Sequence, residues 1–117
     1  MARARSSGDA LAALLALSGA VAVIAGAYGT HGASGKAAEW LSTGSLYQIV
    51  HAVAGLAILA RSRGTAALFL LGMTVFAGTL YAMAFGAPRW LGAITPIGGL
   101  SLILGWMWLA MGYLKGK

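Results

Sequence analysis

Residues 10–28, ALAALLALSGAVAVIAGAY, form a stretch of 19 residues that contains no charged side chain. In an α-helix, which rises 1.5 Å per residue, this stretch is about 28 Å long, close to the ~30 Å hydrocarbon thickness of a bilayer. Three more charge-free stretches follow at about 43–60, 65–85 and 96–114. The pattern predicts an all-α, polytopic membrane protein: a single integral membrane domain, 1–117, with four transmembrane helices.

The composition of the chain supports this class. Of the 117 residues, 60% are hydrophobic and 9% are charged, against about a quarter charged in an ordinary soluble domain. Eight basic and two acidic residues cannot cover the surface of a soluble protein. The basic residues are scattered along the chain, so nucleic acid is not an expected partner. Without cysteine the chain has no disulfides, thiolate metal ligands or cysteine nucleophiles.

The joints between the stretches are short, which favours antiparallel neighbours and an up-down-up-down bundle. Six basic residues fall on one side of the membrane, against Lys36 and Arg89 on the other; they are Arg3, Arg5, Arg61, Arg63, Lys115 and Lys117. Because cytoplasmic segments carry the excess of Lys and Arg, both termini are expected in the cytoplasm. The "AGA" before Tyr28 also resembles a signal-peptide cleavage site, but the apolar run is longer than a signal core, so we expect a retained span.

The first joint, SGKAAEWLSTGSLYQ (34–48), is amphipathic, because Trp40, Gly44 and Tyr47 recur at helical spacing. A short interfacial helix between the first two spans fits this pattern. An extended amphipathic start of the second span fits it equally well.

Small residues predict where the helices pack. Lipid competes for apolar surface, so close backbone contact at glycine drives helix association. The expected packing positions, mostly seven residues apart within a span, are Gly19 and Gly26 with Ala12, Gly72 with Thr79, and Gly98, Gly105 and Gly112. A seven-residue repeat favours left-handed packing. Thr95 before Pro96 is expected to cap the fourth span.

The supply of chemically active residues is small. The carboxylates are Asp9 and Glu39, and the histidines are His31 and His51. We therefore expect no enzyme activity, metal or cofactor. The candidate polar or ligand-binding residues are His31, Tyr47, Gln48, His51, Arg89 and Thr95.

His51 lies eight residues into the second span, about 12 Å, which places it between the outer interface and the midplane. Tyr47 precedes it by one helical turn, and Gln48 is adjacent. A buried polar group in lipid normally finds a protein partner, so a structural hydrogen bond is expected. The expected partners are Tyr or Thr of the third span, or backbone near Gly26 in the first.

His31 is expected to end the first span, with Gly29 and Gly32 in left-handed conformations. An alternative is an outer polar cluster of His31, Lys36 and Arg89 beside the start of the fourth helix. Such a cluster could hold an anion or a lipid head group.

Four segments, GAYGTHGA, TGSLYQIVHAVA, FAGTLYAM and PRWLGAITPIGGLSLILGW, resemble in order and spacing the YgdD-like family, small four-helix membrane proteins of unknown function. The similarity runs from Ala13 to Leu109. It implies a four-span inner-membrane protein and supplies no activity, substrate or cofactor. The positions that match its motifs are Gly29, His31, Gly32, Tyr47, Gln48, His51, Pro96, Gly98 and Gly99.

Three functions remain open. The first is a non-catalytic packing protein, either a homo-oligomer or an accessory subunit of a larger membrane complex. The second is a small channel, carrier or lipid-handling protein with a polar seam around Gln48, His51 and Thr79. The third is a haem-binding or electron-transfer module that uses His31 and His51. Membrane lipid is the expected surrounding in each case.

Overall fold

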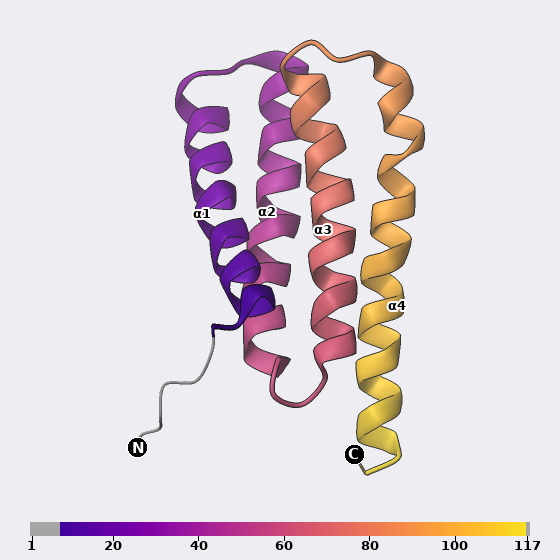
Figure 1. Ribbon diagram of the computed structural model, residues 1–117. Helices are drawn as coiled ribbons and strands as arrows, with labels where there is room; N and C mark the ends of the chain where they lie inside the picture. Colours follow the sequence, from indigo (N-terminus) through magenta and orange to yellow (C-terminus); the bar gives the residue numbers. More distant parts are fainter. Residues whose placement is uncertain (1–7, 117) are drawn as a thin grey trace.

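A computed structural model describes residues 8–116 of the chain, and all of its regular structure is helical. The helices are α1 (Ala10–His31), α2 (Gly35–Ile58), α3 (Arg63–Ala84), the 3₁₀ helix η1 (Arg89–Ala93) and α4 (Thr95–Leu114). The four long helices alternate in direction, and both ends of the chain lie at the same end of the molecule as the α2–α3 turn (Figure 1). Each is long and apolar enough to cross a membrane, which confirms the predicted class.

The first joint is a tight turn followed by one continuous helix. α2 runs unbroken from Gly35, which adopts a left-handed φ of 61°, through Lys36, Glu39 and Trp40 into the span. The prediction of a separate interfacial helix is therefore wrong. The alternative, an extended amphipathic start of the second span, is confirmed. The segment 36–48 contains no proline that would interrupt the backbone hydrogen bonds, so the helix continues.

The last joint differs from the expectation. The sequence did not predict η1, and Thr95 does not cap α4. The cap residue is Ile94, Thr95 is the first helical residue, and Pro96 lies in the first turn as expected. The Thr95 hydroxyl is 2.6 Å from that of Thr79 on α3, so it ties two helices together instead of capping its own.

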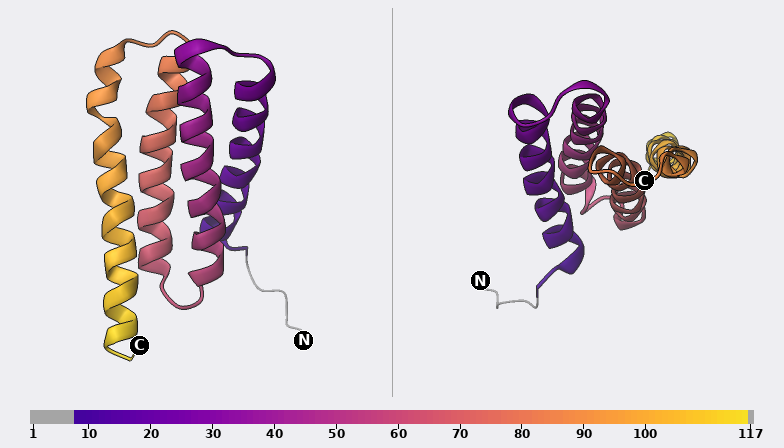
Figure 2. Two further views of the ribbon diagram at one scale, coloured as in Figure 1. Left: turned by 180° about the vertical axis from the view of Figure 1, so that it is seen from behind. Right: turned by 90° about the horizontal axis from the view of Figure 1, so that it is seen from above.

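The four helices alternate in direction as expected, and they lie side by side in an open row. α2 packs against α1 and α3, and α1 touches α3 lightly. The backbone of α4 lies close to that of α3 only among the long helices, and α4 reaches α2 through its side chains. The view along the helices shows this curved row (Figure 2), and the molecule measures 49 × 32 × 19 Å. Short joints fix only which helices are sequential neighbours. In lipid, apolar area alone gives little drive to close the row.

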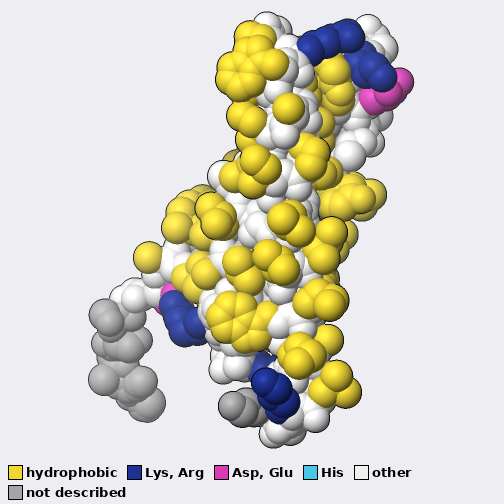
Figure 3. All heavy atoms as spheres, turned by 90° about the vertical axis from the view of Figure 1, so that its right-hand side faces the viewer, with side chains coloured by type: hydrophobic (Ala, Val, Ile, Leu, Met, Phe, Trp, Pro, Cys, Tyr) yellow, Lys and Arg dark blue, Asp and Glu magenta, His cyan; other side chains and the backbone are white. Residues whose placement is uncertain are grey.

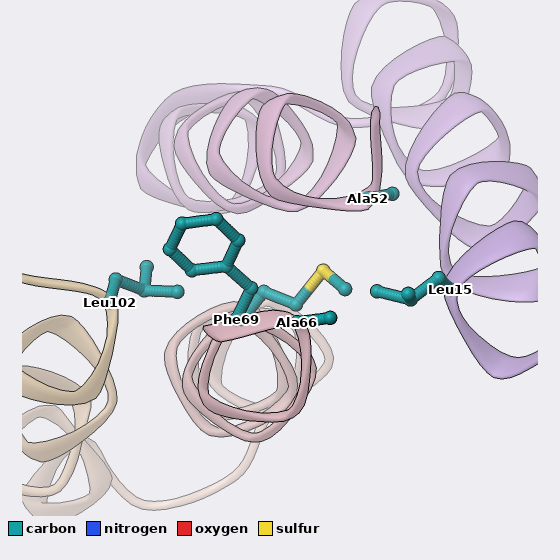
Figure 4. Packing of buried hydrophobic residues seen from close by; sticks show 6 residues of the cluster. Leu15, Ala52, Ala66, Phe69 and Leu102 are labelled. Atoms are coloured by element: carbon teal, nitrogen blue, oxygen red, sulfur yellow. The ribbon is translucent and has the colours of Figure 1, made fainter. Parts of the chain in front are cut away.

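The buried centre of the row gathers around α3. Phe69 and Ala66 of α3 are fully buried, with Leu15 of α1, Ala52 of α2 and Leu102 of α4 around them (Figure 4). Large hydrophobic side chains on the other faces are exposed. On the α4 side hydrophobic atoms cover the middle of the molecule, and Lys and Arg side chains lie toward its two ends (Figure 3). This is the surface of a protein whose solvent is lipid.

The predicted glycines give close contact mainly between α3 and α4. A Cβ added at Gly98 would lie 2.5 Å from the Phe76 nitrogen and 2.7 Å from the Gly72 oxygen. A Cβ at Gly72 would meet Leu102 at 2.8 Å, and one at Gly105 would meet the Phe69 ring at 2.7 Å. At these three positions a side chain would push the helices apart.

The remaining predicted glycines differ among themselves. A Cβ at Gly26 would meet Ser45 Oγ of α2 at 2.6 Å, so this position is tight. At Gly19 the nearest atoms, on Ile49 and Ala52, lie at 3.8 and 3.9 Å, an ordinary contact. Within the described residues, a Cβ at Gly112 would meet no atom within 4 Å. Gly112 is therefore not a packing position in this chain, because the end of α4 extends beyond its contact with α3.

Candidate functional site

His51 is the polar centre of the membrane-spanning region. Its side chain is 6% exposed, and both ring nitrogens have partners. Nδ1 is 2.7 Å from the Tyr47 carbonyl oxygen, and the Trp106 indole N–H donates to Nε2 at 3.0 Å. A carbonyl only accepts and an indole N–H only donates, so these partners assign the neutral ring with its proton on Nδ1. A doubly protonated ring would set two donors against each other at Trp106.

Aromatic rings surround His51. The Phe69 ring meets it edge-on at 5.1 Å, the Trp106 ring lies 5.8 Å away, and the Tyr47 ring is nearly parallel at 6.3 Å. The expected interhelical hydrogen bond is present, but its partner belongs to α4 instead of α3 or α1. A donor from α4 was missed because α2 and α4 are not sequential neighbours.

The structure also gives the position of His51 along its helix. The sequence placed the start of its span at Thr43, whereas α2 begins at Gly35. His51 lies 16 residues after Gly35 and seven before Ile58, or about 24 Å and about 10 Å along the axis. It therefore belongs to the half of the helix nearer the α2–α3 turn.

Gln48 forms a second polar contact, separate from that of His51. Its side chain is 6% exposed, and its Oε1 accepts a 2.7 Å hydrogen bond from the Tyr81 hydroxyl of α3. Gly44 makes room for the Tyr81 ring, because a Cβ there would lie 2.6 Å from Cε1 of that ring. Tyr81 was not among the predicted site residues, although it is the one tyrosine of α3.

Half-buried hydroxyls also bridge neighbouring helices. Ser45 donates to the Ala22 carbonyl of α1 at 2.8 Å, and Ser101 donates to the Leu68 carbonyl of α3 at 3.0 Å. Thr79 pairs with Thr95, as described above. Gln48, His51 and Thr79 thus contact different partners at different helix contacts. They do not line one shared polar seam.

The outer residues do not gather into one cluster. His31 is the exposed last residue of α1, and among residues 8–116 its side chain makes no hydrogen bond. Lys36 pairs with Glu39 at 3.4 Å, and the Arg89 guanidinium lies 5.5 Å from the centre of the Trp40 ring. The interactions of Lys36 and Arg89 therefore lie within α2 and between η1 and α2.

The left-handed glycines were placed wrongly. In the described part of the chain positive φ occurs at Gly35, Gly86 and Gly116, and not at Gly29 or Gly32. α1 ends with the Gly32 N–H donating to the Tyr28 carbonyl at 2.7 Å. Gly29 is buried because α2 passes close to it, with Leu41 Cβ 3.0 Å from the position of an added Cβ.

At the opposite end, Asp9 connects α1 to α3. Its carboxylate accepts the Ala12 N–H and caps α1, and it accepts two hydrogen bonds of 3.0 and 3.1 Å from the Arg63 guanidinium. These hydrogen bonds, the one from Arg63 first, lower the pKa of the Asp9 carboxyl from 3.8 to about 2. Arg61 lies 3.7 Å above the Tyr113 ring and links the α2–α3 turn to α4. Neither contact was predicted from the sequence. Arg3, Arg5 and Lys117 of the predicted basic side lie outside the described residues.

The histidines do not meet. His31 is at one end of α1, next to the turn into α2, whereas His51 lies about 24 Å along α2 from that turn. A single chain therefore does not bring both imidazoles to one haem iron. Among residues 8–116 no group of three or more His, Asp or Glu side chains could hold a metal ion.

Comparison with known proteins identifies the family. A family model described as a protein of unknown function (DUF423) matches residues 25–99. The UPF0382 membrane protein of Haemophilus influenzae is 40% identical over 115 residues, which cover 89% of this chain and 93% of that protein. The chain belongs to the YgdD-like DUF423 family. The resemblance noted in the sequence is thereby confirmed.

Other members of the YgdD-like DUF423 family align over most of their length. The UPF0382 membrane protein of Staphylococcus saprophyticus is 39% identical over 111 residues, which cover 86% of this chain and 92% of that protein. The UPF0382 inner membrane protein YgdD of Escherichia coli is 36% identical over 114 residues, or 87% of each chain. No solved structure matches the chain. With four spanning helices and relatives named as membrane proteins, the chain is a multi-pass membrane protein.

Proposed function

We propose that this chain is a non-catalytic subunit of the bacterial inner membrane that works as an assembly of several copies of itself. The observation that carries the proposal is the open row of helices, only 19 Å thick in its smallest dimension. Its joints have three residues between α1 and α2, four between α2 and α3, and ten between α3 and α4, five of them in η1. Little chain therefore lies between the helices to recruit soluble partners. Association between helices within the bilayer is the remaining route, and most oligomers are built from identical chains.

The non-catalytic part of the proposal rests on the state of the polar side chains. His51, Gln48, Thr79 and Thr95 are paired with one another or with other helices. A catalytic site needs an acid, a base or a nucleophile free to act on a substrate in a shaped site. In the membrane these groups instead satisfy each other and hold the row together.

The location and orientation follow from relatives and charge. The E. coli relative is named an inner membrane protein, and this supports the same membrane for this chain. Arg61, Arg63 and Lys115 lie at the end of the row where both termini lie (Figure 1). Since cytoplasmic segments are rich in Lys and Arg, this end is assigned to the cytoplasm.

Because the chain has no cysteine, single cysteines can test the orientation. Ser34→Cys lies in the α1–α2 turn, and Ala60→Cys lies in the α2–α3 turn. In intact cells a membrane-impermeant maleimide should label Ser34→Cys and should reach Ala60→Cys only after permeabilisation. The reverse pattern would overturn the orientation.

The mass of the assembly tests the function itself. The protein is extracted with its lipids in polymer nanodiscs and weighed by native mass spectrometry. The expected result is a multiple of 11.8 kDa built from this chain alone. A monomer at every loading contradicts the assembly, and a stable complex with another protein contradicts self-association in favour of an accessory role.

Crosslinking locates the contact. Cysteines at exposed positions of the end helices, such as Leu17 and Ile24 of α1 or Leu104 and Met107 of α4, are oxidised in native membranes. Disulfide dimers are expected along one helix face, and the fully buried Leu15→Cys is the matched negative control. Equal crosslinking at all positions, or at none, would contradict a defined interface.

A further inference from the structure

Tyr47 carries a polar group for which the rest of the described chain offers no partner. Among residues 8–116 the hydroxyl of Tyr81 donates to Gln48, whereas the Tyr47 hydroxyl makes no hydrogen bond. Tyr28 and Tyr113 resemble Tyr47 in this, but they lie three residues and one residue from the ends of their helices, where head groups and water are at hand. Tyr47 lies in the middle of α2, 12 residues after Gly35 and 11 before Ile58. At that depth an unsatisfied hydroxyl is costly.

Two hollows flank Tyr47. One of about 210 Å³ lies along α2 beside Tyr47 and His51. The other, of about 320 Å³, lies between α2 and α4, with Phe76 of α3 and Gly99 and Trp106 of α4 in its lining. We call this second hollow the α2–α4 groove. Its volume is at the lower end of the range for small-molecule sites, about 300–1,000 Å³.

The lining of the α2–α4 groove selects the chemistry of an occupant. Tyr47 and Phe76 have ring centres 4.5 Å apart, and Trp106 adds a third aromatic surface. No Lys, Arg, Asp or Glu lines the groove, so it offers no partner for a charged group. Both nitrogens of His51 are already bonded, which leaves the Tyr47 hydroxyl as the free hydrogen-bond donor.

A fitting occupant is neutral, planar, soluble in lipid and equipped with an acceptor oxygen. We propose that the α2–α4 groove binds the ring of a lipid-soluble quinone, with the Tyr47 hydroxyl donating to a ring carbonyl oxygen. The isoprenoid tail leaves the groove into the bilayer. This binding is independent of the proposed self-association, since all the residues that line the groove belong to one chain.

Tryptophan fluorescence in proteoliposomes tests the proposal. Trp40, Trp90 and Trp108 are replaced by Phe so that Trp106, in the groove, is the sole reporter, with the four-tryptophan protein measured in parallel. Decylubiquinone is the probe. Decylbenzene, which has a six-membered ring and the same tail but no oxygen atom and does not quench tryptophan, is the control ligand and is added as a competitor. Saturable quenching by decylubiquinone is expected, with decylbenzene binding several-fold more weakly, as the loss of one hydrogen bond predicts.

Variants separate the groove from general partitioning into lipid. Tyr47→Phe keeps the ring and should weaken decylubiquinone binding roughly two- to tenfold. Tyr28→Phe removes a hydroxyl elsewhere and should leave binding unchanged. Gly99→Leu, which places a side chain in the groove, should abolish saturation while circular dichroism still reports a folded helical protein.

Three results would overturn the proposal. The first is quenching that rises linearly with decylubiquinone in all variants, as for collisions in the bilayer. The second is saturable binding that Tyr47→Phe and Gly99→Leu leave unchanged. The third is an unmodified protein that shows no saturable quenching, together with a Gly99→Leu protein that loses its oligomeric mass, because the groove would then be a contact between chains.

Discussion

Replacing Gly98 by alanine tests the contact between α3 and α4. The new Cβ would lie 2.5 Å from the Phe76 backbone nitrogen. Ordinary contacts of a Cβ begin at 3.4 Å, so the difference requires α4 to move away from α3 by about 0.9 Å at this point. Phe76 cannot yield by changing a rotamer, because the clash is with its backbone.

Three terms set the change in the free energy of unfolding, two unfavourable and one favourable. Overpacking in a tight contact costs about 1–3 kcal/mol. The hydrogen bond between Thr79 and Thr95 stretches as the helices separate, and interhelical hydrogen bonds in membranes contribute about 0.6 kcal/mol on average. Alanine is a better helix former than glycine by about 1 kcal/mol, which offsets part of the loss. The net prediction is a decrease of about 0.6–2.6 kcal/mol in the free energy of unfolding.

Gly78→Ala is the matched control. Gly78 lies in α3 and is exposed. A Cβ added there would meet no described atom within 4 Å. This variant should be as stable as the parent or slightly more stable, because only helix propensity changes. Unfolding is followed by far-UV circular dichroism during titration of detergent micelles with sodium dodecyl sulfate. If Gly98→Ala is as stable as Gly78→Ala, the close approach at Gly98 is refuted.

Three further predictions use the same unfolding measurement. His51→Leu and Trp106→Phe should each lower stability by about 1 kcal/mol, and the double variant should lose clearly less than the sum; additive losses would mean that the two side chains do not interact. Tyr81→Phe should cost about 1 kcal/mol because it leaves the Gln48 oxygen without its donor, and an unchanged stability would contradict that bond. The Asp9 carboxyl has a pKa of about 2 when folded against 3.8 as the ordinary value, so its contribution is complete above pH 4 and is lost as the pH falls toward 2. Asp9→Asn should remove that part of the acid dependence, and an unaltered pH profile would show that the cap and ion pair contribute nothing.

The spanning helices were predictable because their signal is local. Each charge-free stretch is enough to predict a spanning helix. α1 ends three residues after its stretch and α2 begins eight residues before its own, because backbone hydrogen bonds continue until a turn intervenes. The order and direction of the helices followed from the short joints. Whether α1 and α4 also meet could not be predicted, because contacts between helices distant in sequence have no local signal. In the structure these two helices do not touch, and the row stays open.

The polar contacts divide in the same way. Tyr47, Gln48 and His51 stood out because polar residues are rare in such a span, and the prediction that His51 is hydrogen-bonded to another helix is confirmed. Its partner Trp106 is 55 residues away in the sequence and lies on α4, which is not a sequential neighbour of α2. A seven-residue glycine repeat likewise identified Gly98 and Gly105 correctly but extended to Gly112, since a periodic pattern does not show where two helices diverge.

Whether the polar side chains in the membrane hold helices together is tested most directly by the protonation state of His51. Solid-state nitrogen NMR of histidine-labelled protein in proteoliposomes distinguishes a protonated from an unprotonated ring nitrogen, and His31→Gln removes the second histidine signal. The expected result is a neutral ring with its proton on Nδ1, and an Nε2 resonance that shifts in Trp106→Phe but not in Trp90→Phe. A ring protonated on Nε2 or on both nitrogens, or an Nε2 resonance indifferent to Trp106→Phe, would contradict the bond that joins α2 to α4.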